Sequence, residues 1–328
     1  RKSMEDSLAT LTREDPSLHI SKDEETGQTL LSGMGELHLE IAKDRLLNEL
    51  NAEIEVGKVM VSYKETVNKA TQPNSTETDD GYKLTLGIEP FKGDRKDSKV
   101  AGEEWHSLGS DSNYLVMERH HEFNTTSNWP FQIPYEALVN ALMSSSIAAL
   151  QKGGTIANFP LHSTVVRVKG DWSLPQDATS AAKVLSLSRP LITTTLNQLQ
   201  DSDYSVLEPI MNVEVSVQQQ DMGAVIQDLT GARKANILSI DEEHEIASGA
   251  ASNITFERIA EEQYLPRDTT LELANIKNEN KVSKVIKARV PLKDMVSYTN
   301  KLRSLTQGRG NFHMDYHGME KVTQERLQ

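Results

Sequence analysis

VPLKDMVSYTNKLRSLTQGRGNFHMDY, residues 290–316, carries the clearest structural signal in the chain. Pro291 stands where a helix would begin, and apolar residues then recur at the spacing of one buried helix face: Leu292, Met295, Val296, Leu302 and Leu305. A glycine-containing turn follows, and the alternation from Phe312 to Tyr316 predicts a strand. The stretch therefore predicts a helix that turns directly into a strand.

The segments before this stretch complete a βαββαβ unit. Their patterns predict three strands, at 211–217, 237–240 and 282–290. A short helix is predicted at 221–229, between the first two strands. Together with 290–316 this is the element order of a ferredoxin-like sandwich, which we assign to residues 206–328. A polar excursion at about 248–280 is expected to be an insertion.

The N-terminal residues 1–66 show the same order without its first strand. The predicted elements are a helix, two hairpin strands, a second helix and a last strand, at about 3–13, 18–20, 29–31, 36–50 and 53–63. We expect the missing strand to precede Arg1 in a longer chain.

The middle block, residues 67–205, has a different α+β pattern. Its clearest elements are strands at 82–88 and 164–168 and a helix that begins at Pro134. The polar segment 92–113 is expected to be a mobile insertion. Asp177 is expected to cap a helix that begins at Ala178, after an exposed loop at about 169–178. The sequence thus predicts an α+β protein of three domains, in which two ferredoxin-like sandwiches flank the middle domain.

Composition narrows the class of protein. The 328 residues include 35 Lys and Arg against 48 Asp and Glu, a net charge of −13, and no cysteine. The lack of cysteine excludes a disulfide scaffold, a Cys-ligated zinc site, an iron–sulfur cluster and a cysteine nucleophile in this chain. No apolar run approaches the roughly 20 residues that cross a bilayer, so no membrane partner is expected.

Positive charge is concentrated in one segment of this acidic chain. From Lys281 to Arg309 there are eight basic residues and one acid, Asp294, which gives a local charge of +7. Charge alone fits a solvated helix face and a docking site for a polyanion equally well. The turn Gln307-Gly308-Arg309-Gly310 could bring backbone and guanidinium against a phosphate or could be an ordinary tight turn. Its position in the basic segment favours contact with RNA.

The sequence shows no catalytic or nucleotide-binding motif. Gly57-Lys58 lacks the earlier glycine and the following hydroxyl residue of a phosphate-binding loop. The cluster Glu118-Arg119-His120-His121-Glu122 lacks the i, i+4 histidine pair of a zinc helix. A metal-dependent enzyme that uses His120 and His121, and an interaction module unrelated to RNA, are the alternatives from other classes.

Several strings of the sequence resemble elongation factor G. Ser32-Gly33-Met34-Gly35-Glu36-Leu37-His38-Leu39-Glu40-Ile41, preceded by Glu14-Asp15-Pro16-Ser17, resembles the third domain of that family. The fifth domain of the family has a stretch similar to Leu302-Arg303-Ser304-Leu305-Thr306-Gln307-Gly308-Arg309-Gly310. The fourth domain has only short stretches similar to this sequence, at Ile88-Glu89-Pro90 and Ile133-Pro134. The resemblance implies a middle domain of the ribosomal protein S5 second-domain type. It also implies a parent GTPase whose GTP and Mg²⁺ bind in a G domain outside this chain, so no catalytic, cofactor or metal site is expected here.

What the resemblance implies for these residues is ribosome binding. In the family, the third domain contacts the small subunit, the fourth enters the intersubunit region and the fifth rests on large-subunit RNA at the stalk base. Contacts are therefore expected from the tip loop and from the basic helix and turn: Trp172, Ser173, Leu174, Pro175 and Gln176, and Lys293, Lys301, Arg303, Gln307 and Arg309. Trp172 and Leu174 are expected to be exposed at the tip, unless Trp172 folds back on its own strand.

The tip loop departs from that of translocating members of the family. If Asp177 is aligned with the aspartate of their loop, Leu174 takes the place of a histidine that reaches the codon–anticodon helix, with Pro175 beside it. The sequence is therefore most similar to the mitochondrial, ribosome-releasing branch of the family. That branch implies disassembly of post-termination ribosomes with ribosome recycling factor, by a monomer in the mitochondrial matrix. A mitochondrial translocation factor is the nearest alternative.

Overall fold

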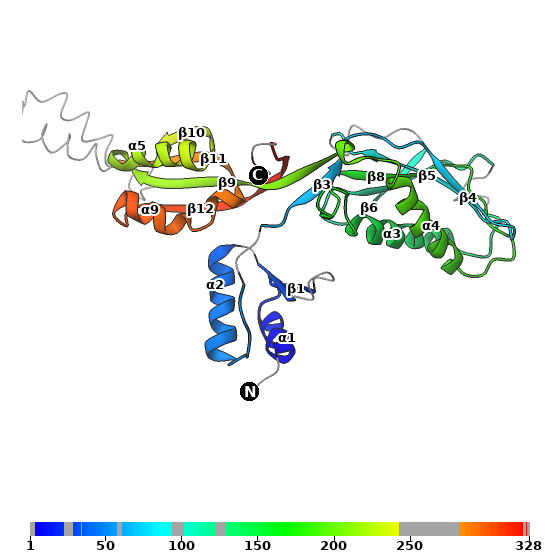
Figure 1. The fold of residues 1–328 in the computed structure, drawn as a ribbon, viewed down its shortest axis with the longest axis horizontal. Helices are drawn as coiled ribbons and strands as arrows, with labels where there is room; N and C mark the ends of the chain where they lie inside the picture. Colours follow the sequence, from blue (N-terminus) through cyan, green and yellow to red (C-terminus); the bar gives the residue numbers. More distant parts are fainter. Residues whose placement is uncertain are drawn as a thin grey trace, which may run out of the picture. The chain divides into compact units, whose positions relative to one another are not determined.

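The computed structural model divides the chain into two compact units. It describes residues 4–22, 29–33, 35–57, 61–93, 102–122, 129–242, 282–323 and 326. The first unit comprises Arg1–Val61 and Ile210–His317, and the second comprises Ser62–Pro209 and Gly318–Gln328. Both contain helices and strands, which confirms the predicted α+β class (Figure 1). None of the described helices is long and apolar enough to cross a membrane.

The N-terminal part of the first unit combines two helices with a hairpin. Its elements are α1 (Met4–Glu14), β1 (His19–Lys22), β2 (Thr29–Ser32) and α2 (Glu36–Asp44), which continues as a π-helical turn over Arg45–Glu49. β1 and β2 pair antiparallel, as the hairpin prediction requires. A small core holds this part together and consists of Leu8, Leu11, Leu18, Ala42 and Leu46.

The C-terminal part of the first unit is a complete ferredoxin-like sandwich. Its elements are β9 (Tyr204–Gln218), α5 (Gln219–Gln227), a π-helical turn (Asp228–Ala232), β10 (Asn236–Glu242), β11 (Ser283–Pro291), α8 (Leu292–Met295), α9 (Tyr298–Thr306) and β12 (Asn311–Lys321). The sheet order is β10-β11-β9-β12, so the fourth strand of the unit pairs with the first. The insertion predicted at about 248–280 lies outside the described residues.

The strand order of the C-terminal sheet explains why the last strand predicted for the N-terminal part is not seen among the described residues. The described residues 51–57 and 61–63 form no strand, so the strand predicted at about 53–63 is wrong. A fourth strand of this fold would pair with the first strand, and the described residues of the N-terminal part contain no such first strand. Without that partner, its backbone hydrogen bonds have no ladder to join.

The single helix predicted after Pro291 is divided in two. α8 ends at Met295, Ser297 has a φ of 63° in the left-handed region, and α9 begins at Tyr298. Val296 lies at the break and is 37% exposed, so its predicted place in the buried stripe is wrong. The remaining stripe is in the core, where Met295 and Leu302 are buried and Leu292 and Leu305 pack against it.

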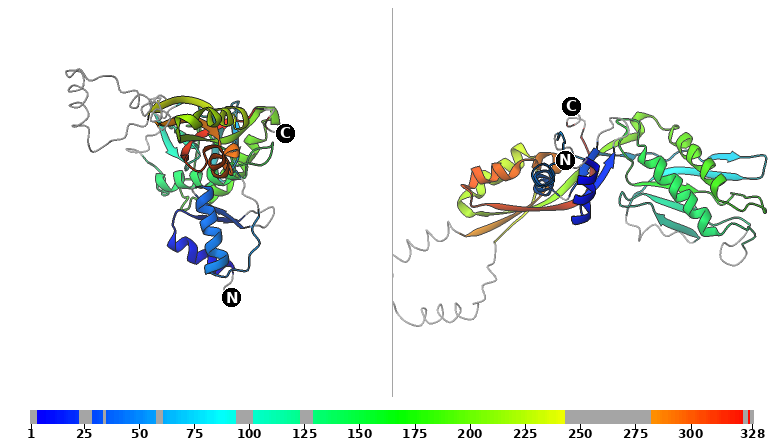
Figure 2. Two further views of the ribbon diagram at one scale, coloured as in Figure 1. Left: turned by 90° about the vertical axis from the view of Figure 1, so that its left-hand side faces the viewer. Right: turned by 90° about the horizontal axis from the view of Figure 1, so that it is seen from below.

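The second unit is built on a five-stranded sheet covered by two helices. Its elements are β3 (Lys64–Val67), β4 (Asn74–Glu77), β5 (Lys83–Pro90), β6 (Glu103–Ser107), β7 (Tyr114–Glu118), α3 (Tyr135–Gln151), β8 (Thr164–Val168), α4 (Ala182–Leu196) and a 3₁₀ turn (Asp201–Asp203). The sheet order is β4-β5-β8-β7-β6, and β7 and β8 are parallel. Figures 1 and 2 show α3 and α4 together on one face of this sheet. There they bury Leu86, Leu115, Leu142, Val166 and Ile192.

Two predictions for the middle block need correction. The segment 92–113, predicted as a mobile insertion, contains a strand of the sheet, because β6 lies within it and pairs with β7. The helix predicted from Ala178 begins at Ala182, about one turn later, so Asp177 does not cap it.

A buried carboxylate fixes the loop between α3 and β8. Glu65 on β3 is fully buried, and its carboxylate accepts backbone N–H groups from Ala157 at 2.9 Å, Phe159 at 3.1 Å and Ile156 at 3.2 Å. These bonds satisfy a charge that would be costly to bury alone. A Cβ on Gly154 would lie 1.9 Å from Glu65 Oε2, so this close approach requires glycine.

Candidate functional site

The two apolar residues of the predicted tip loop are buried. Trp172 is 4% exposed and Leu174 is 9% exposed, and both belong to the core of the second unit. The Trp172 ring lies 5.9 Å from Phe131 and 5.8 Å from Trp129, measured between ring centroids. The expectation that Trp172 and Leu174 are exposed is therefore wrong. Trp172 turns inward, and its ring packs against Trp129 and Phe131.

Backbone pairing is what turns these side chains inward. Ser173 exchanges two hydrogen bonds with Lys83 at the start of β5, each 3.0 Å long. Ser173 thus forms an isolated antiparallel bridge with Lys83, and the side chains around it alternate, with Trp172 and Leu174 inward and Ser173 outward. Gly170 allows this bend, because a Cβ there would lie 2.1 Å from the backbone oxygen of Arg119. The apolar–polar–apolar alternation was the sequence signal for this arrangement.

The other tip residues remain accessible. Ser173 and Gln176 are exposed, and Pro175 is half-buried. The surface that this loop offers is thus polar rather than apolar, with the Ser173 hydroxyl, the Gln176 amide and the Asp177 carboxylate exposed.

The histidine pair does not form a metal site. Glu122 N–H donates to His120 Nδ1 at 3.1 Å, so His120 Nε2 carries the proton that it donates to the Trp172 carbonyl at 2.8 Å. Both nitrogens of this buried imidazole are therefore engaged. Within the described part of the chain, no three His, Asp or Glu side chains could hold a metal ion. The metal-enzyme alternative has no support.

A second polar cluster joins Asp15, Ser17 and His38 but does not form a catalytic triad. The Asp15 carboxylate bonds both partners, with Oδ2 at 2.6 Å from His38 Nε2 and Oδ1 accepting the Ser17 N–H at 3.1 Å. Activation of a serine needs an imidazole between hydroxyl and carboxylate, and here the carboxylate is central. This cluster holds α2 against the loop after α1.

The basic helix presents three cations to solvent. Lys293 on α8 and Lys301 and Arg303 on α9 are exposed, because Leu302 and Thr306 turn the opposite side of α9 into the core. Within the described residues, none of these three cations forms an ion pair. They are available to bind an anion.

Other cations of the same segment are already neutralised. Lys284 pairs with Glu242, Lys287 Nζ lies 3.2 Å from Asp241, and Arg309 Nη2 lies 3.1 Å from Asp221. These three acids from outside the segment reduce its local charge from +7 to +4. The positive surface is therefore centred on α8 and α9 rather than on the whole segment.

The glycine-flanked turn is shaped by the end of α9. Gln307 has a φ of 52°, Gly308 has a φ of 80°, and Gly308 N–H donates to the Arg303 carbonyl at 2.9 Å. Arg309 then reaches α5, where its guanidinium donates to both Asp221 oxygens. The turn thus has a structural function, and Arg309 would have to share its guanidinium with Asp221 in order to bind a phosphate.

Comparison with known families assigns both ends of the chain. Residues 1–58 match the family model for Elongation Factor G, domain III, and residues 272–328 match that for the Elongation factor G C-terminus. The chain belongs to the elongation factor G family. Its two ends are the third-domain and C-terminal parts of that family, as the sequence resemblance implies.

Curated relatives match the chain along its whole length. It is 58% identical over 328 residues to "Ribosome-releasing factor 2, mitochondrial" of Kluyveromyces lactis and covers 41% of that protein. It is 47% identical over 335 residues to the Saccharomyces cerevisiae protein of the same name, of which it covers 40%. The elongation factor G family member described here therefore spans about two fifths of the length of these relatives.

A solved structure has the same fold. A crystal structure of a protein from Thermus thermophilus aligns with 98% of this chain and 39% of its own, with a TM-score of 0.56 and 22% sequence identity. This likeness supports the arrangement of helices and sheets within the elongation factor G family member, and nothing finer.

Proposed function

We propose that this chain is the ribosome-binding part of a mitochondrial translational GTPase that disassembles post-termination ribosomes together with ribosome recycling factor. The observation that carries the proposal is the 58% identity over the whole chain to a mitochondrial ribosome-releasing factor 2. GTP and Mg²⁺ would bind in a G domain outside these residues, and the protein would act as a monomer in the mitochondrial matrix. The described residues would contribute by position, not by covalent chemistry.

The tip loop favours release over translocation. With Asp177 aligned to the aspartate of the translocating members' loop, the resemblance puts Leu174 in the place of their histidine, and Leu174 is buried. A buried aliphatic side chain offers no hydrogen bond to a codon–anticodon helix. The exposed Ser173 and Gln176 are the groups through which this loop would meet the ribosome or ribosome recycling factor.

A subunit-splitting assay tests the proposal. The full-length protein, purified mitochondrial ribosomes, ribosome recycling factor and GTP are mixed, and dissociation is followed by light scattering. We expect dissociation that requires both factors and GTP, and little peptide elongation in a parallel assay. Efficient elongation without dissociation would replace the proposal with the translocation alternative.

Charge reversal tests which surface binds ribosomal RNA. We expect Lys301→Glu with Arg303→Glu to weaken ribosome pelleting at least tenfold, because two free cations become like charges to phosphate. The control, Lys152→Glu with Arg189→Glu, makes the same charge change at exposed positions in the second unit, directly after α3 and on α4. Equal weakening by the two double variants would mean that overall charge, not this helix, sets the affinity.

A further inference from the structure

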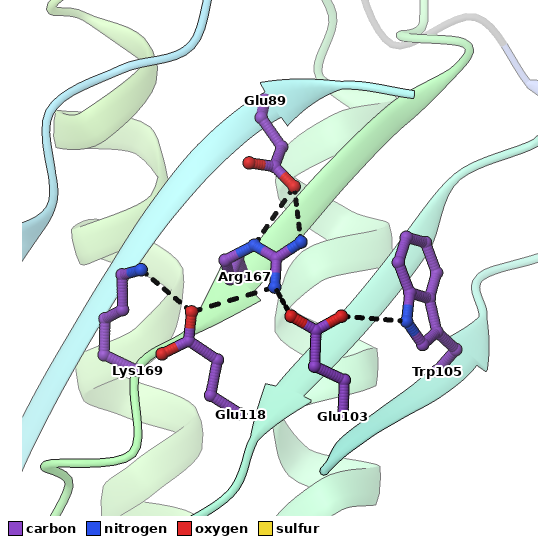
Figure 3. Close-up of polar contacts among 6 residues, drawn as sticks. All are labelled: Glu89, Glu103, Trp105, Glu118, Arg167 and Lys169. Atoms are coloured by element: carbon purple, nitrogen blue, oxygen red, sulfur yellow. Dashed lines mark hydrogen bonds and ion pairs between the residues drawn. The ribbon is translucent and has the colours of Figure 1, made fainter. Parts of the chain in front are cut away.

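One face of the β4-β5-β8-β7-β6 sheet is not packed against α3 or α4. Leu86, Leu115 and Val166 point to the helices, so their chain neighbours point to the opposite face. On that face Trp105, Val116, Arg167 and Gly87 are register partners in one row across four strands. Figure 3 views the charged part of this face, with the helices behind the sheet.

Every cation in Figure 3 is already paired with a carboxylate. Arg167 donates to Glu89 at 2.8 and 3.0 Å, also bonds Glu103, and lies 3.7 Å from Glu118. Lys169 Nζ lies 2.8 Å from Glu118, and Trp105 Nε1 donates to Glu103 at 3.2 Å. Burial disfavours the charged guanidinium, but the hydrogen bonds and charges of Glu89 and Glu103 outweigh burial and raise the pKa of Arg167.

Three half-buried aromatic rings lie on the same face of the sheet, next to this network of charged side chains. Phe91, Trp105 and Tyr114 pack against one another, with ring centroids 4.8, 5.7 and 6.1 Å apart. Two valines on the same face, Val116 and Val165, are fully buried beside them. Protein–protein interfaces are enriched in partly exposed aromatic residues and in arginine, and these residue types dominate binding hot spots.

The charges decide which kind of macromolecule fits. Three carboxylates surround two cations in the network, a net charge of −1, and the nearby Lys83–Asp171 pair is neutral. RNA phosphates would meet carboxylates with no free cation among these side chains to offset them. A protein surface that carries Lys or Arg would complement the same carboxylates and leave the aromatic rings to be covered by apolar side chains.

We propose that this face, formed by Phe91, Trp105, Tyr114, Glu89, Glu103 and Glu118, docks a lysine- or arginine-bearing protein surface of the ribosomal complex rather than RNA. The inference rests on the proposed function, because it takes the ribosome as the source of the partner. It differs from the α8–α9 surface, whose three exposed cations form no ion pair with any described residue and fit an anion.

The test uses two exposed serines on opposite sides of the sheet. Ser107 is the last residue of β6 and lies on the face of the sheet that is not packed against α3 or α4. Ser186 lies on α4, which covers the opposite face. In the full-length protein, we expect Ser107→Lys to weaken pelleting with purified mitochondrial ribosomes about threefold relative to Ser186→Lys, because the new charge repels a basic partner. Stronger binding of Ser107→Lys would indicate RNA and overturn the proposal, as would equal binding of the two variants.

Photo-crosslinking identifies the partner without altering charge. A photoreactive amino acid at position 107, or at 186 as the control, is irradiated in the ribosome-bound full-length protein. The proposal expects a protein crosslink from 107 that is absent from 186; an RNA crosslink or no crosslink from 107 overturns it. Failure of the unmodified protein to bind ribosomes would instead overturn the proposed function, and the docking face with it.

Discussion

Asp15 connects the loop after α1 to helix α2. The hydrogen bonds from Ser17, and then that from His38, lower the pKa of Asp15 from 3.8 to about 2. A carboxyl with a depressed folded-state pKa adds stability above its unfolded pKa and loses that stability as the pH falls through the folded value. The contribution of Asp15 should therefore be complete above about pH 4 and be lost towards about pH 2.

Hydrogen exchange of residues 4–57 measures this effect. In Asp15→Asn we expect faster exchange than in the parent at pH 6, and a difference that shrinks as the pH approaches 2. Glu40→Gln removes an exposed carboxylate from α2 and is the control. A difference between Asp15→Asn and the parent that persists unchanged at low pH would contradict this account.

Gly154 is the residue whose replacement should most disturb the second unit's α3–β8 loop. The new Cβ in Gly154→Ala would displace the buried Glu65 carboxylate from the N–H groups of the loop. A buried acceptor left unpaired costs about 1–3 kcal/mol, and more when it is charged. We expect a loss of about 3 kcal/mol in the free energy of unfolding, measured by urea denaturation. Gly231→Ala is the control, because a Cβ there meets nothing within 4 Å. Near-equal stability of the two variants would show that the loop relaxes freely.

Leu174→His would not create a translocation factor. The imidazole would enter the core beside Trp172 instead of reaching solvent, and we expect a loss of about 2–4 kcal/mol in unfolding free energy. Gln176→His, at an exposed position of the same loop, should leave stability nearly unchanged. Peptide elongation on mitochondrial ribosomes should stay at the parent level in both variants, and a gain with Leu174→His would contradict the burial argument.

Between elements, the tie from Arg309 to α5 controls how free this guanidinium is. Asp221→Asn removes the carboxylate that Arg309 now binds, while it keeps the shape of the side chain. If Arg309 also contacts RNA, ribosome pelleting should strengthen about twofold to threefold. The double variant Asp221→Asn with Arg309→Gln should lose that gain. No gain in the single variant would mean that Arg309 is a structural link only.

Elements with strong local patterns were predictable, and those that depend on a partner were not. The β-branched run from Thr164 to Val168 was predicted as a strand, and it forms β8 with these bounds. β6 escaped prediction because Glu103, Glu104 and His106 are polar on both faces of the strand, and the pairing with β7 supplies what the pattern lacks. The described residues 51–57 and 61–63 form no strand, although their pattern suggested one, because strand formation depends on a partner strand and not on the local pattern alone.

At the scale of the whole molecule, we expect the affinity of this anionic chain for ribosomal RNA to depend on a small number of cations. Each phosphate contact adds about −0.7 to −0.9 to the slope of log affinity against log salt concentration. We expect Lys301→Gln with Arg303→Gln to make this slope shallower by about 2 in ribosome pelleting from 50 to 200 mM salt. Lys152→Gln with Arg189→Gln should leave the slope unchanged, and an equal change in both would contradict a localised contact.

The surface chemistry was only partly predictable at this scale. The sequence placed eight cations in one segment, but it could not show that Asp221, Asp241 and Glu242 neutralise three of them, because these acids come from other elements. The aromatic and acidic face of the second unit was missed for the same reason. Its residues lie on β6 and β7 and at the end of β5, and β5 is joined to β7 through β8 only in the folded sheet.

The long strand β9 limits how this protein can be dissected. Residues 204–207 pair with β3, and residues 210–218 pair with β11, so one uninterrupted strand serves both ladders. A cut between 205 and 206 would remove part of the ladder of β3 and leave a frayed end on each fragment. Limited proteolysis should therefore spare this region, and shorter versions made for crystallisation should keep β9 whole.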